Sequence, residues 1–236
     1  MDFLPTKGFE YLLVIGYLLL LIPFLRFVLQ GRTAEATAQE GRLAVRSVGL
    51  SDRQMSSWFA VPDGYHYHRG HTWALREGED VFRVGMSDLA ERLLGYPERL
   101  LLPPVGSRIR QGEPGFHVAV AGQIVPMLSP LGGEVVEVNQ DIGRSPELVC
   151  EDPYGRGWLM RIRVPQPEAA VSNLLPGPLA RVYLDHSVER LSGMMAPQLG
   201  AVLQDGGVPV CGFARELAPE SWQRIVREMF LTANPK

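Results

Sequence analysis

The densest group of residues that could do chemistry is the run of histidines His66, His68 and His71 in YHYHRGH. Alternate residues of a strand share a face, so His66 and His68 could both reach one metal ion. No cysteine is close in the sequence, and Asp63 is the one obvious carboxylate that could supplement them. This ligand set is incomplete, so structural roles are favoured, and His66 and His68 are kept only as candidate metal ligands.

Two other groups contain the residue types of catalytic sites. Asp185, His186 and Ser187 are consecutive, and consecutive side chains point in different directions, so they cannot form a nucleophilic relay. Glu151 and Asp152 are paired carboxylates, but they adjoin the turn sequence DPYG, where a structural role is expected. The sequence contains no phosphate loop, dinucleotide fingerprint, haem attachment motif or nucleophile elbow. We therefore expect a protein that is not an enzyme.

Lysine is almost absent from this chain of 236 residues. Of its 23 basic residues, only Lys7 and Lys236 are lysine, and the others are arginine. A cofactor joined through an amide or a Schiff base needs a lysine amine, so such chemistry has only the two chain ends to use. The net charge is −3 and no basic patch of the nucleic-acid type is present. The two cysteines, Cys150 and Cys211, fit a reducing compartment and are interpreted as structural thiols.

The elements that must position these residues begin with an apolar segment near the N-terminus. Residues 11–25 carry no charge, and with their apolar neighbours they reach about 20 residues, enough to span a bilayer core. We predict an N-terminal tail (1–7) and a transmembrane helix (8–30), not a signal peptide, because no suitable cleavage site follows. Arginines follow the span, whereas only Lys7 precedes it. The positive-inside rule then places the N-terminus outside the cytoplasmic membrane and the rest of the chain in the cytoplasm.

After a predicted linker (31–59), short alternating runs indicate a β domain over residues 60–165. Turn signals separate these runs. The runs lie at 71–75, 81–86, 116–120, 133–138 and 158–164. One helix is expected over Ser87 to Leu94, with Ser87 as its N-terminal cap and Gly95 as its stop. The domain is therefore predicted to be mainly β with some α.

A C-terminal extension with helices is predicted over residues 166–236, because four prolines between 165 and 178 break the preceding pattern. Its last segment, residues 219–231, has an apolar stripe at helical spacing that must be buried. The stripe contains Trp222, Ile225, Val226, Met229 and Phe230. It could pack on the β domain or bind a partner subunit, and the sequence leaves both possibilities open.

Several stretches of the β domain resemble the H protein of the glycine cleavage system. They are HTW at 71–73, VGMSDLA at 84–90, LPPVGSRIRQG at 102–112, SP at 129–130 followed by GEVVEVN at 133–139, and SPELVCEDPYGRGW at 145–158, which is nearly the family's SPELVNxDPYGxGW. The resemblance covers about residues 65–164 and implies a lipoyl-domain-like barrel-sandwich of packed antiparallel sheets. It also implies an exposed hairpin on which the family carries a lipoyl-lysine in an E-S-x-K-A motif.

This chain departs from the family at the hairpin. Counting from Phe116 puts the lysine position at Gln123, and counting back from Ser129 puts it at Gly122. Neither residue can hold an amide-linked lipoyl arm, so we expect no cofactor.

The replaced hairpin is also more apolar than an acceptor loop should be, so it is expected to contact another protein or to be buried under the C-terminal extension. The residues proposed to bind a partner are Val120, Ile124, Val125 and Met127.

These features predict a non-catalytic structural or adaptor subunit of a larger membrane complex, held in the bilayer by residues 8–30. Complexes of photosynthetic or respiratory electron transfer are the expected class. The H subunit of bacterial photosynthetic reaction centres has the same layout, a single helix with its N-terminus outside and a cytoplasmic β domain. This is an analogy of layout and rests on no shared motif. The alternative is a regulator, assembly factor or decoy that binds lipoylation or glycine-cleavage components.

Overall fold

The computed structural model describes residues 57–202 and 209–232. Contacts divide the chain into residues 1–49 and 50–236, and every described residue belongs to the second unit. The predicted tail (1–7), transmembrane helix (8–30) and most of the linker therefore lie outside the described residues. Within the described part, no helix is both long enough and apolar enough to cross a membrane.

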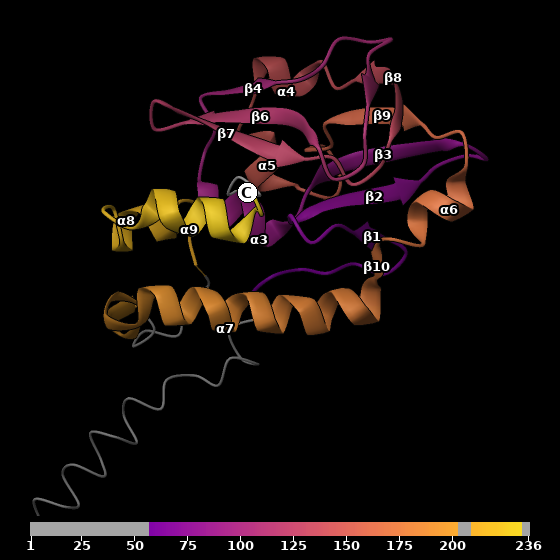
Figure 1. The fold of residues 1–236 in the computed structure, drawn as a ribbon. Helices are drawn as coiled ribbons and strands as arrows, with labels where there is room; N and C mark the ends of the chain where they lie inside the picture. The colour runs from indigo at the N-terminus through magenta and orange to yellow at the C-terminus, as the bar shows by residue number, and fades with distance from the viewer. Residues whose placement is uncertain (1–56, 203–208, 233–236) are drawn as a thin grey trace, which may run out of the picture. The chain divides into compact units, whose positions relative to one another are not determined.

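Two antiparallel sheets make up most of the described domain (Figure 1). The larger has seven strands in the order β10-β1-β2-β3-β9-β8-β5, and the smaller has three in the order β4-β6-β7. The strands are β1 (His66–Tyr67), β2 (Thr72–Arg76), β3 (Val81–Met86), β4 (Arg99–Leu101), β5 (Arg108–Ile109), β6 (Pro114–Val120), β7 (Gln123–Leu128), β8 (Gly133–Val138), β9 (Met160–Arg163) and β10 (Leu175–Pro176). The expectation of a mainly β domain with some α is confirmed.

The described helices are short, except α7 in the C-terminal part. They are α3 (Asp88–Leu94), α4 (Asp141–Arg144), α5 (Leu148–Glu151), α6 (Pro167–Val171), α7 (Gly177–Val202), α8 (Phe213–Leu217) and α9 (Trp222–Met229). Helix α3 corresponds to the helix predicted over Ser87 to Leu94. Ser87 caps it as expected, since its hydroxyl accepts a hydrogen bond from the Ala90 amide at 3.4 Å. Gly95 ends the helix at φ 90°, a conformation that favours glycine.

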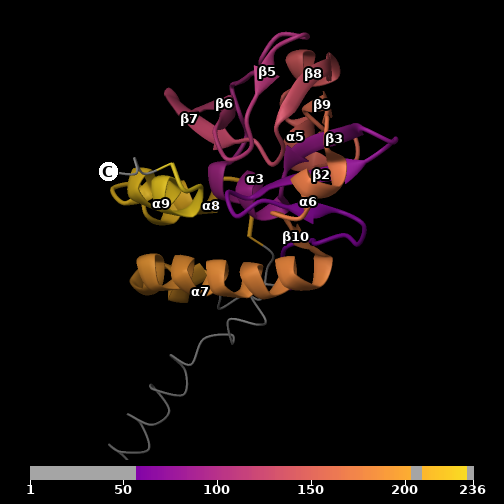
Figure 2. The ribbon, with the colours of Figure 1, turned by 45° about the vertical axis from the view of Figure 1, so that its right-hand side comes forward.

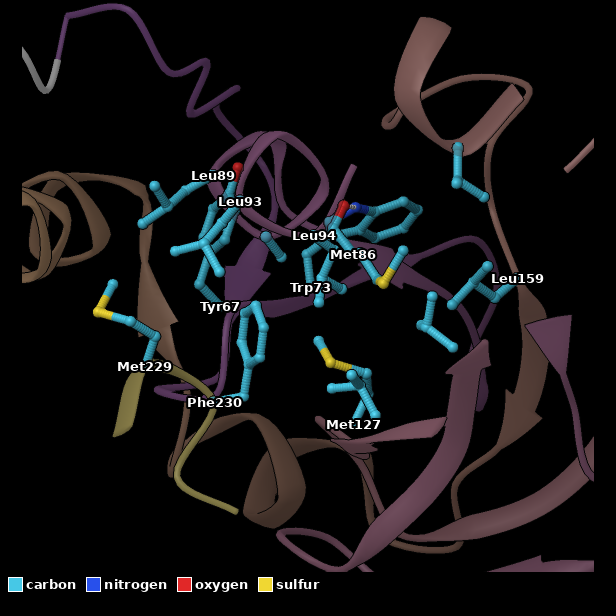
Figure 3. Packing of buried hydrophobic residues seen from close by; sticks show 14 of the residues in the cluster. Tyr67, Trp73, Met86, Leu89, Leu93, Leu94, Met127, Leu159, Met229 and Phe230 are labelled. Atoms are coloured by element: carbon cyan, nitrogen blue, oxygen red, sulfur yellow. Dashed lines mark hydrogen bonds between the residues drawn. The ribbon is translucent and has the colours of Figure 1, made fainter. Parts of the chain in front are cut away.

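Trp73 of β2 lies at the centre of the core, fully buried among the residues shown in Figure 3. Its indole N–H donates a hydrogen bond to the Met86 carbonyl oxygen at 2.6 Å. Gly85 of β3 is the cross-strand partner of Trp73, and a Cβ atom at Gly85 would lie 2.3 Å from the indole ring. Two of the motifs noted in the sequence, HTW and VGMSDLA, therefore pack directly against each other, and the indole occupies the space of the missing side chain.

The motif that includes Asp152 forms a rigid turn after α5. The Asp152 carboxylate accepts hydrogen bonds from the backbone amides of Gly155 at 3.0 Å and Arg156 at 2.8 Å. A Cβ atom at Gly157 would lie 2.6 Å from the Leu148 carbonyl oxygen, so glycine is required there. The structural role expected for Asp152 is confirmed.

The larger sheet continues beyond the domain boundary predicted at residue 165. Strand β10 pairs antiparallel with β1, opposite His66 and Tyr67. Pro176 is accommodated because β10 is the edge strand, where a missing N–H leaves no neighbouring strand unpaired. The prolines that indicated a boundary in the sequence thus lead into the last strand of the sheet.

The C-terminal helices pack on the domain. Figures 1 and 2 both show α8 and α9 between α7 and the smaller sheet. The apolar stripe of α9 is buried, with exposures of 4% or less at Trp222, Ile225, Val226, Met229 and Phe230. Of the two possibilities left open, the structure shows packing on the chain's own domain. The alternative in which these five residues bind a partner is not favoured, because the chain's own domain covers them.

Candidate functional site: the β6–β7 hairpin

The hairpin that replaces the expected acceptor loop is a tight two-residue turn. Ala121 and Gly122 connect β6 to β7 with φ angles of 52° and 70°, the positive values of a type I′ turn. The Gly122 amide donates a hydrogen bond to the Glu98 carboxylate at 3.0 Å. Val120 pairs with Gln123 across the hairpin. The two candidate lysine positions, Gly122 and Gln123, are therefore the second turn residue and the first residue of β7.

The strand alternation sends most of the apolar hairpin residues inward. Val120 and Met127 are fully buried, and Val125 is 4% exposed. The prediction that these three contact a partner is corrected, because they belong to the chain's own core. Ile124 is different: it pairs with Ala119 on the opposite face and is 60% exposed. Of the four predicted hairpin contacts, only Ile124 lies at the surface.

The turn predicts an effect on stability. A non-glycine residue with φ near 52° is strained, and asparagine tolerates this conformation better than alanine does. We expect Ala121→Asn, which creates an Asn-Gly turn, to raise the free energy of unfolding by about 0.5–1 kcal/mol. Urea unfolding followed by circular dichroism measures this. An unchanged or lowered midpoint for Ala121→Asn would contradict the type I′ assignment.

Comparison with known proteins identifies the domain that bears this hairpin. The profile of the glycine cleavage H-protein family matches residues 65–185, just over half of the chain. The chain belongs to the glycine cleavage H-protein family. It is 37% identical over 110 residues to the H protein of Mycobacterium tuberculosis, covering 47% of this chain and 82% of that protein. It is 43% identical over 104 residues to the H protein of Rubrobacter xylanophilus, covering 44% of this chain and 82% of that protein.

A solved structure is also similar, the H protein from Mycobacterium marinum, with 28% sequence identity and a TM-score of 0.45. The alignment covers 50% of this chain and 94% of that chain. The family match ends inside α7, so α8 and α9 lie beyond the H-protein region.

The residues of the H-protein hairpin do not fit an amide-linked lipoyl group. Ala121 and Gly122, which form its tip, are exposed but carry no reactive group, and Gln123 is half-buried. A carboxamide nitrogen is not a nucleophilic amine, so Gln123 cannot replace a lysine in amide formation. Ile124 adds an exposed apolar side chain beside the tip. The hairpin tip therefore offers no amine for covalent attachment.

His66 lies in β1, and His68 and His71 lie in the turn that follows it. Among the described residues, no group of three or more His, Cys, Asp or Glu side chains could hold a metal ion. Nδ1 of His68 accepts a hydrogen bond from the Gly70 amide at 3.0 Å, so one of its nitrogens is occupied. Burial lowers the pKa of His66. Burial, with smaller effects from Arg190 and His68, lowers the pKa of His71 to about 3. His71 is therefore a neutral core residue at physiological pH.

Glu91 of α3 is a buried carboxyl group that sequence reasoning missed. It is 1% exposed, and neither carboxylate oxygen has a hydrogen-bond partner among the described residues. Burial, and then the nearby Asp88 carboxylate, raise the pKa of Glu91 well above its ordinary value. Nothing in the sequence SDLAERLL indicates this, because a glutamate in a short helix usually faces solvent.

The raised pKa predicts how stability depends on pH. The folded chain holds a proton on Glu91 that the unfolded chain releases above its ordinary pKa of 4.5, so this contribution to stability falls as pH rises. Gln resembles the protonated form but cannot ionise. We expect Glu91→Gln to raise the free energy of unfolding by about 1–3 kcal/mol at pH 8 and to have little effect at pH 4.

Denaturant unfolding of both proteins at several pH values measures this difference. The matched control is Glu79→Gln, which changes an exposed side chain and should leave stability unaltered at each pH. A gain for Glu91→Gln that is the same at pH 4 and pH 8 would show that ionisation of Glu91 is not its cause.

Proposed function

We propose that this member of the H-protein family is a non-catalytic structural or adaptor subunit of a larger membrane complex, with a domain that is not lipoylated. The observation that carries the proposal is the hairpin tip, where Ala121, Gly122 and Gln123 stand in the region of the family's lipoyl-lysine. A carrier without an attachment point cannot shuttle a substrate arm. A folded domain that keeps its core motifs can still present surfaces to other proteins.

Two further features support an adaptor role. Ile124 is 60% exposed on a hairpin whose other large apolar residues are buried, and exposed apolar side chains often mark contact surfaces. The apolar segment of residues 8–30, known only from the sequence, is long enough to anchor the domain to the cytoplasmic membrane. Together they favour a domain held at a membrane, with the hairpin directed to a partner subunit.

The test is purification of the full chain from its own membranes in a mild detergent. We expect integral membrane proteins to co-purify with the wild-type chain in a fixed molar ratio. The Ile124→Asp variant should no longer co-purify with them. Val120→Asp is unsuitable, because Val120 is fully buried and the charge would unfold the domain. The control is Val105→Asp, since Val105 is a similarly exposed apolar residue, at 59%, on the loop between β4 and β5. Recovery of the chain alone, in the aqueous fraction, would contradict the proposal.

A decoy or assembly factor for the glycine-cleavage or lipoylation machinery is the second candidate. It is favoured by the length of the match, since the similarity spans 82% of the Mycobacterium tuberculosis H protein. A decoy would bind soluble glycine-cleavage enzymes transiently and compete with a lipoylated H protein in their assay. An adaptor subunit would bind membrane partners stably and leave that assay unchanged.

A further inference from the structure

The two cysteines of the chain are distant in sequence, but both lie beside Gly95 at the end of α3. Cys150 belongs to α5 of the H-protein domain, and Cys211 belongs to the turn that precedes α8 in the C-terminal extension. Both are free thiols of intermediate burial. The family match ends at residue 185, so Cys211 lies beyond the H-protein region. A bond between their two sulfur atoms would therefore join the H-protein domain to its extension.

The backbone around Cys211 is fixed against the end of α3. The Gly212 amide donates a hydrogen bond to the Arg92 carbonyl oxygen at 2.7 Å, and the Arg92 guanidinium donates one to the Pro209 carbonyl oxygen at 2.7 Å. A Cβ atom at Gly95 would lie 2.9 Å from Gly212 Cα, so the two backbones meet closely at paired glycines. On the other side, the Cys150 thiol donates to the Gly95 carbonyl oxygen at 3.5 Å. The Cys150 thiol and the Cys211 backbone are thus both held beside Gly95.

The surroundings give the two thiols different reactivity. The interaction of the two thiols with each other is the leading cause of the lowered pKa of Cys211 and of the raised pKa of Cys150. The Arg92 guanidinium also favours the thiolate of Cys211. A thiolate is the reactive form of cysteine, so Cys211 is suited to attack an oxidant and Cys150 to respond to it.

We propose that Cys150 and Cys211 form an oxidisable pair that closes a reversible disulfide between the H-protein domain and its C-terminal extension. With a peroxide as oxidant, the Cys211 thiolate attacks one peroxide oxygen and the O–O bond breaks. The departing hydroxide takes a proton to become water, and Cys211 becomes a sulfenic acid. The Cys150 sulfur then attacks the sulfenic sulfur, a second water leaves, and the disulfide forms. Two thiols lose two electrons in total, and one peroxide is reduced to two waters.

The disulfide would link the segment of α8 and α9 covalently to the domain, on which that segment already packs. It closes a loop of about 60 residues, and cross-links over loops of this length restrict the unfolded chain strongly. We expect oxidation to raise Tm by roughly 10 °C. A dithiol reductant should return Tm to the value of the reduced chain.

The experiment treats the reduced full chain with hydrogen peroxide, blocks remaining thiols with an alkylating agent, and maps the peptides by mass spectrometry. We expect a peptide cross-linked through Cys150 and Cys211, formed at a rate independent of protein concentration. Cys150→Ser should accumulate a sulfenic acid on Cys211, whereas Cys211→Ser should leave Cys150 reduced under the same treatment. Circular dichroism of both serine variants verifies that they fold.

Three results would overturn the proposal. They are cross-links between separate chains, alkylation of both thiols at full yield after peroxide treatment, and over-oxidised Cys211 in the wild-type chain without a cross-link. Unequal alkylation of the two thiols in the reduced wild type provides an independent measurement. We expect Cys211 to react at least tenfold faster than Cys150, and equal rates would contradict the assigned roles.

Discussion

Replacing Phe230 by alanine is expected to lower the free energy of unfolding by about 3–5 kcal/mol, because it removes a fully buried aromatic side chain. The ring lies among residues of the β domain (Figure 3), and it meets the His71 ring edge-on at a centroid distance of 6.2 Å. Phe230 thus joins the end of α9 to the turn between β1 and β2. Denaturant unfolding measures the loss. Limited proteolysis should also show earlier cleavage within residues 209–232.

The control for this prediction is the next residue. Leu231 is 41% exposed, so Leu231→Ala should change stability by less than about 1 kcal/mol. If Phe230→Ala is as stable as Leu231→Ala, the extension does not depend on this contact for its packing. Its buried stripe would then contribute little to the stability of the domain.

Substituting Gly85 by alanine is the second change with a large expected effect. The added methyl group would meet the Trp73 indole at 2.3 Å, and the indole is held by its hydrogen bond to the Met86 carbonyl oxygen. Neither the indole nor the central strand β3 can shift freely in a packed core. We expect a loss of about 3 kcal/mol or more in the free energy of unfolding, at the upper end of overpacking effects.

Gly143→Ala is the matched control for Gly85→Ala. A Cβ atom at Gly143 meets nothing within 4 Å, and the residue is exposed in α4. Alanine there should be neutral or slightly stabilising. Equal effects at the two glycines would refute the close packing of Trp73 on β3.

Local sequence patterns predicted much of the β domain, because its strands alternate and its caps are local. Strand β3 covers the run predicted at 81–86, and α3 has both Ser87 and Gly95 in the expected roles. The hairpin was harder, because both of its faces carry apolar residues. Only the two-residue turn determines that Ile124 pairs with Ala119 on the outer face while Val120 and Val125 face inward.

Features that depend on contacts distant in sequence could not be predicted. The surface that covers Phe230, the approach of Cys211 to Gly95 and Cys150, and the buried carboxyl of Glu91 all depend on how the extension packs on the domain. The apolar stripe of α9 indicated that these residues must be buried, but it did not indicate which surface covers them. The absence of lysine from residues 8–235 is, by contrast, a property of composition, and it supplied the main functional inference.

The central claim is that this H-protein domain does not carry a lipoyl group, and intact mass spectrometry tests it most directly. The full chain is expressed with a lipoate ligase and excess lipoate, beside an H protein that has the E-S-x-K-A motif as a positive control. We predict that the control gains a lipoyl group in full while this chain keeps its unmodified mass. A lipoyl mass increment on this chain would contradict the account and identify it as a carrier.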